Sequence, residues 1–300
     1  MKRHFNIALL SVLILSSCQG EQVNRTTDLP ADEERENYQA SDSKVYHNAR
    51  KIFYSMPSPL ELISLIQSAG GDYRKDLLHN PNKVNNYQSR TKQALVLGVY
   101  GADLSYATIY EKKHDAVQFL AATKRLGESI GVHEPFNASL IERANANLDN
   151  RDSMFSIVTE MYWHTTSQLR EENRDPVTLL IMAGGWAEGL YLGTSVMKID
   201  QPDPEIGKRI AEQKFVSMQL QQMFEDYSDH EMVQQAYPLF APTFDYYATL
   251  TITEEPTTTS TDPATGEVTI KGRKEINFST EDLSQLANLA AELRNNIVRL

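Results

Sequence analysis

The chain has 300 residues, with 29 basic and 40 acidic side chains, so its net charge is −11. Such an acidic surface repels the phosphates of nucleic acids and of anionic lipid headgroups, which argues against a nucleic-acid partner and against membrane docking through basic residues. Cys18 is the only cysteine, so the chain contains no disulfide and no thiolate metal site.

The first residues are typical of a bacterial lipoprotein signal. Lys2 and Arg3 precede an apolar run, 5–15, that is too short to span a bilayer. The run ends in LSSC, in which small residues admit the signal peptidase and the cysteine is acylated. We therefore expect residues 1–17 to be removed as a signal peptide and Cys18 to carry the lipid. The alternative is an ordinary secretory leader with an incidental cysteine.

Lipidation would place the protein in the cell envelope. Loss of Lys2 and Arg3 would change the net charge from −11 to −13, so membrane attachment would depend on the acyl chains at Cys18. Gln19 follows the cysteine, where an aspartate favours retention in the inner membrane, so we expect the outer membrane. Residues 18–43 are polar and acidic with few bulky apolar side chains, which predicts a flexible tether.

Residues 44–300 predict a single all-α domain of about nine to ten helices, because apolar residues recur at intervals of three and four. A small β-hairpin is expected near 248–278, where threonine and apolar residues alternate around the turn sequence DPATG. Pro238 and Pro242 should break or kink the helical segment at 230–250. The other helices are predicted at 44–55, 58–69, 89–111, 113–130, 137–149, 152–172, 176–197, 204–226 and 281–299.

Capping signals mark several helix starts. Ser279 and Asp282 have the spacing of a capping box, in which each side chain accepts a hydrogen bond from an otherwise unpaired amide. Two Asp-Pro pairs, at 175–176 and 203–204, predict an N-cap aspartate followed by a proline at the first helical position.

Two helices have an unusual composition. The helix at 89–111 carries Ala94, Gly98 and Ala102 at four-residue spacing, and the helix at 176–197 carries glycine at 185, 189 and 193. Glycine costs about 1 kcal/mol relative to alanine in a helix interior, so we expect these residues to allow close backbone contact. Both helices should therefore be the most buried and should pack together. Membrane spanning is the weaker interpretation, since Glu188 lies in the middle of the second helix.

Each of these helices holds one carboxylate in its apolar middle, Asp103 or Glu188, which must be paired, hydrogen-bonded or shifted in pKa when buried. The structural hypothesis is that both accept hydrogen bonds from tyrosine hydroxyls or from an arginine such as Arg143 or Arg209. The functional hypothesis is a shared cleft that binds a polar ligand or a cation. Its lining would then comprise Tyr100, Asp103, Tyr106, Trp186, Glu188 and Tyr191.

Catalytic and cofactor motifs are incomplete. Glu111 and His114 have the spacing of a helical di-iron site but lack the second copy, and Ser89 and Lys92 match the Ser-x-x-Lys of penicillin-recognising enzymes without its companion motifs. There is no Walker A loop, dinucleotide fingerprint or nucleophile elbow. No catalytic residue, metal or cofactor is predicted, and the sequence leans against an enzyme.

The LSSC signal, the segment FYSMPSPLELISLIQSAG at 53–70 and the helix GVYGADLSYATIY at 98–110 resemble a group of uncharacterised lipoproteins from Bacteroidota. The resemblance runs over most of 44–250 and implies an envelope lipoprotein with a helical fold and no assigned activity. Two hypotheses follow: a membrane-tethered, non-catalytic binding or scaffold module with an envelope protein partner, or an envelope hydrolase or small-ligand sensor that uses Asp103 and Glu188.

Overall fold

The computed structural model describes part of the chain, all of it within the unit Val45–Leu300. The lipidation site Cys18, the predicted signal peptide and tether, the helix at 44–55 and most of the helix at 58–69 lie outside the described residues. The described residues are 63–64, 67–68, 72–197, 203–254, 258–261, 268–271 and 274–299.

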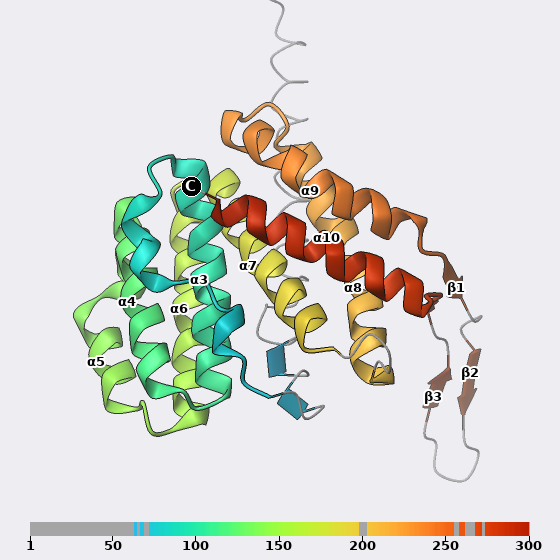
Figure 1. Cartoon of the computed structure of the whole chain (residues 1–300), viewed down its shortest axis with the longest axis horizontal. Helices are drawn as coiled ribbons and strands as arrows, with labels where there is room; N and C mark the ends of the chain where they lie inside the picture. Colours follow the sequence, from blue (N-terminus) through green and yellow to red (C-terminus); the bar gives the residue numbers. More distant parts are fainter. Residues whose placement is uncertain are drawn as a thin grey trace, which may run out of the picture. The chain divides into compact units, whose positions relative to one another are not determined.

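The described part of the chain is all-α with a small antiparallel hairpin, as the periodicity predicts (Figure 1). Each helix lies within a few residues of its predicted range. The α-helices are α3 Arg90–Ile109, α4 Lys113–Ser129, α5 Ala138–Ala146, α6 Arg151–Glu171, α7 Asp175–Val196, α8 Pro204–Asp226, α9 Glu231–Thr249 and α10 Thr280–Val298. Short 3₁₀ helices are η1 Lys75–Leu77, η2 Pro81–Asn86 and η3 Glu134–Phe136.

Helices α3 and α7 form the centre of the fold. They pack against each other, α4 and α6 pack on α3, and α10 lies across α7 next to α9 (Figure 1). Every residue from Val177 to Leu190 is buried. Within the described residues, no helix has both the length and the apolar character that crossing a membrane requires.

Glycines bring the backbones of α3 and α7 into contact. A Cβ atom at Gly98 would lie 2.0 Å from the carbonyl oxygen of Ile181, and one at Gly184 would lie 2.0 Å from that of Leu95. Neither position tolerates a side chain without separation of the helices. The predicted close packing is confirmed, and Gly184 adds a contact outside the 185, 189 and 193 spacing.

The capping predictions are confirmed at two helices and wrong at a third. Ser279 and Asp282 form the capping box of α10, and Asp203 accepts hydrogen bonds from two amides in the first turn of α8. The prediction for α7 is off by one residue, because this helix begins at Asp175 and its N-cap is Arg174. The carbonyl of Arg174 accepts the first helical hydrogen bonds, and its guanidinium is held by backbone carbonyls just after α4.

The expected break in α9 does not occur. This helix continues through Pro238 and Pro242, which are both exposed. The prolines are four residues apart and so share one face, where the carbonyl groups that lose an amide partner can be hydrated. A proline in the buried face would have left those carbonyls without any partner.

The predicted hairpin consists of two nested antiparallel strand pairs. Strand β1 (Ile252–Glu254) pairs with β4 (Lys274–Ile276), and β2 (Thr258–Thr261) pairs with β3 (Val268–Lys271). Ile252 lies opposite Ile276. The predicted turn sequence lies outside the described residues.

Candidate functional site

One face of α3 is covered by residues 72–88, a segment of two short 3₁₀ helices and their connections that we call the strap. Two tyrosines of α3 bind its backbone. The Tyr100 hydroxyl donates to the carbonyl of Asn80 at 2.9 Å. The Tyr106 hydroxyl donates to the carbonyl of Asp72 at 3.1 Å and accepts from the amide of Arg74 at 3.0 Å. These two hydroxyls thus pair three backbone polar groups of the strap.

Asp103 lies between the two tyrosines and binds the same segment. Its Oδ2 atom accepts a hydrogen bond from the amide of His79 at 3.1 Å. Tyr100, Asp103 and Tyr106 are spaced by three residues, which places them on one face of the helix. The predicted site residues on α3 therefore share a role, which is to hold the strap.

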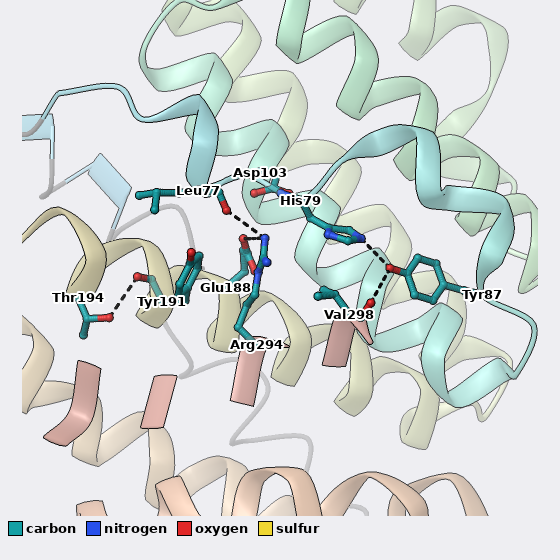
Figure 2. A network of polar contacts seen from close by, with 9 residues as sticks. All are labelled: Leu77, His79, Tyr87, Asp103, Glu188, Tyr191, Thr194, Arg294 and Val298. Carbon is teal, nitrogen blue, oxygen red and sulfur yellow. Dashed lines mark hydrogen bonds and ion pairs between the residues drawn. The ribbon is translucent and has the colours of Figure 1, made fainter. Parts of the chain in front are cut away.

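Glu188 on α7 forms a buried ion pair with Arg294 on α10 (Figure 2). The Nε atom of Arg294 lies 3.0 Å from Oε2 of Glu188, and its Nη2 atom lies 3.4 Å from Oε1. Nη2 also donates to the carbonyl of Leu77 in the strap at 3.0 Å. The exposed fraction is 0% for Glu188 and 8% for Arg294. One guanidinium thus joins α10, α7 and the strap.

Asp103 and Glu188 converge, as the sequence predicts. Burial raises the pKa of Asp103 well above its usual range, and the neighbouring Glu188 carboxylate raises it further. Burial also raises the pKa of Glu188, whereas Arg294 lowers it. The Oδ1 atom of Asp103 has no donor among the described residues and faces Glu188. Two carboxyl groups can hydrogen-bond only if one is protonated, so we assign the proton to Asp103, which leaves one anion and one cation.

Asp103, Glu188 and Arg294 form a buried group that we call the cluster. His79 extends the cluster towards the end of α10 (Figure 2). Its Nε2 atom lies 2.6 Å from the hydroxyl oxygen of Tyr87, and that hydroxyl donates to the carbonyl of Val298 at 3.2 Å. With the tyrosine proton used in this way, Nε2 of His79 is the protonated nitrogen of a neutral ring. Burial and the nearby Arg294 lower the pKa of His79 to about 3. The ring stacks on Tyr100.

The other predicted site residues, both on α7, diverge. Tyr191 joins the cluster, because its ring centroid lies 4.8 Å from the guanidinium carbon of Arg294. Trp186 lies apart from it: its Nε1 atom donates to Gln213, and its ring packs against Phe244 and Tyr247. Residues two apart in a helix point in nearly opposite directions, so Trp186 and Glu188 cannot line one space.

Sequence reasoning missed the cation. The arginines that it named are elsewhere: Arg143 binds Glu160, and Arg209 binds Glu212. Arg294 was the available signal, because it lies within the apolar face of α10 that includes Ala290, Leu293 and Ile297. A charged residue inside such a face must find a buried partner. His79 and Tyr87 carry no comparable signal, since the strap has no helical or strand periodicity.

The cluster is closed to solvent. Neither Asp103 nor Glu188 has any exposed surface. A surface cleft beside the strap is lined by residues that include Lys75, His79 and Asp115, but by neither of these two carboxylates. Across the described ranges, no group of three or more His, Cys, Asp and Glu side chains is arranged to hold a metal ion. The arrangement supports charge pairing and backbone binding.

Comparisons with known proteins do not add a family. No protein-family model, curated protein or solved structure matches this chain. The resemblance to Bacteroidota lipoproteins therefore stays a prediction, and function has to be inferred from the geometry of the chain itself.

Proposed function

We propose that the protein is a non-catalytic binding or scaffold module, tethered to the outer membrane by acyl chains on Cys18. The supporting observation is the burial of Asp103 and Glu188, whose donors are the chain's own Arg294 and the His79 amide. A general acid or base must reach its substrate directly or through a water molecule. These carboxylates instead hold the strap and α10 on the central helices.

A surface on α6 suits a protein partner. Phe155 and Trp163 are two turns apart on this helix and are 37% and 41% exposed. Aromatic side chains are enriched at protein interfaces, and tryptophan is prominent among the residues that dominate binding energy. The opposite face of α6 is buried, so these two side chains are available while the helix stays packed.

The anchoring part of the proposal is tested by fractionation of cells that express the full chain. We expect the parent protein in the membrane fraction and the Cys18→Ala variant in the soluble fraction. Ser11→Ala, a change within the apolar run of the leader, is the matched control and should partition like the parent. An unchanged partition of Cys18→Ala would contradict lipid anchoring.

The binding part is tested by crosslinking in native envelopes followed by co-purification. Trp163→Ala should lose a partner that the parent retains, whereas Met218→Ala, which alters an exposed apolar side chain on α8, should keep it. Loss of the partner in both variants, or in neither, would contradict a binding surface on α6.

The rival function, an envelope hydrolase or small-ligand sensor, makes a different prediction for Glu188. If this carboxylate served chemistry, Glu188→Gln would keep the parent's melting temperature and lose only activity or ligand binding. If it serves the fold, as we propose, the same variant melts well below the parent, because the buried Arg294 loses its counter-ion.

A further inference from the structure

A cavity lies beside the face of α3 opposite the strap. Its volume is about 60 Å³, smaller than the roughly 150 Å³ of a dry cavity that admits benzene. It is lined by residues of α3, α4, α6, α7 and η3, and neither Asp103 nor Glu188 is among them. The lining residues used below are Gly101, Ser105, Thr123, Tyr162 and Thr165.

Gly101 forms part of this cavity. A Cβ atom at this position would meet nothing within 4 Å, whereas one at Gly98, three residues earlier, would collide with α7. Glycine weakens a helix interior relative to alanine, and at Gly98 close packing explains its presence. At Gly101 there is no such contact. The missing side chain leaves open space instead.

The polar groups of the wall are mostly paired within their own helices. The hydroxyls of Ser105, Thr123 and Thr165 donate to the carbonyls four residues earlier, at 2.7 to 2.8 Å. They therefore present little unpaired polarity to the cavity. The Tyr162 side chain also lines the cavity.

We propose that this cavity binds the end of an unbranched alkyl chain that belongs to an amphipathic molecule of the fatty-acid type. The small, apolar space suits a chain of methylene groups better than a ring. This inference goes beyond the proposed function, since it depends neither on lipid anchoring nor on a protein partner.

Dodecanoic acid is the probe, titrated calorimetrically into the full chain carrying Cys18→Ala, so that no acyl chain of the protein itself competes. We expect saturable binding of one molecule per chain. Gly101→Leu, which places a side chain in the cavity, should weaken binding at least tenfold. Met218→Ala removes an exposed apolar side chain outside the cavity lining and is the control, with unchanged affinity.

Gly101→Ala covers the case in which the leucine variant does not fold. Its single methyl group fits the open space, so the protein should fold and bind dodecanoic acid several times more weakly. The same titration with the unaltered, lipidated chain distinguishes a free fatty acid from the protein's own acyl chain, because weaker binding there indicates internal competition. Equal affinity of the parent, Gly101→Leu and Gly101→Ala would overturn the proposal. So would uptake of many molecules per chain without saturation.

Discussion

The two faces of α3 are built from different chemistry. Towards the strap, Tyr100, Asp103 and Tyr106 hydrogen-bond to backbone groups. Towards α6, Gly101 and Ser105 line an apolar cavity. The difference arises from what each face covers. An irregular segment has backbone groups that need partners, whereas a neighbouring helix has already paired its own. Buried polarity in this helix thus indicates where irregular backbone is packed, and does not by itself indicate an active site.

The largest effect is expected on the polar face. Arg294→Met should lower the free energy of unfolding by about 3–5 kcal/mol, because Glu188 would remain buried without its cation. Urea denaturation measures the change. Adding Glu188→Leu to this variant should restore much of the loss, since no unpaired charge remains. Arg125→Met, at an exposed position on α4, is the control and should have little effect. A loss below about 1 kcal/mol for Arg294→Met would show that the ion pair does not hold the strap.

Gly98→Ala tests the contact between α3 and α7. The new Cβ atom would lie 2.0 Å from the carbonyl oxygen of Ile181 and 2.5 Å from the amide nitrogen of Gly185, so the helices would have to separate. We expect destabilisation of about 1–3 kcal/mol or more, measured by thermal and urea unfolding. Unchanged stability would mean that the two backbones are not in contact.

The pH dependence of stability separates His79 from the other ionisable groups. Its pKa is about 3 in the folded protein against 6.5 ordinarily, so the unfolded chain binds this proton first as pH falls. The stabilisation by neutral His79 is complete above pH 6.5 and declines towards pH 3. The stability difference between the parent and His79→Gln should therefore fall by up to about 1.36 kcal/mol per pH unit over that range. Asp103, with a raised pKa, changes stability in the opposite sense, and it does so in both proteins. Parallel pH curves would contradict the assignment.

The smallest effect is expected on the cavity face, and its sign is reversed. Gly101→Ala should raise stability by about 0.4–1 kcal/mol, because alanine favours the helix and reduces the entropy of the unfolded chain. The melting temperature measures it. Together with Gly98→Ala, this gives the same substitution three residues apart with opposite outcomes. Destabilisation at Gly101 would show that the space is already occupied by packed atoms.

The sequence alone determined the helices and much of their packing. Helix ranges follow from apolar periodicity and from caps such as Ser279 and Asp203, which depend only on neighbouring residues. The approach of Asp103 to Glu188 was also predictable. Glycine at 98 and near 185 indicates backbone contact between the middle of α3 and the middle of α7, where these carboxylates lie. The predicted break at Pro238 and Pro242 does not occur, because both prolines lie on the exposed face of α9 and the helix continues through them.

The tertiary structure decided what the carboxylates bind. Arg294 is 106 residues from Glu188, and although its position in the apolar face of α10 indicates a buried cation, no local pattern identifies Glu188 as its partner. The strap has no periodic signal, so its cover over α3 could not be predicted, and neither could the roles of His79 and Tyr87. The cavity beside Gly101 could not be predicted from the sequence either, because empty space depends on how four helices and η3 pack around one another. Local rules specify which residues must be paired or packed, and only the three-dimensional arrangement of distant segments supplies the partner.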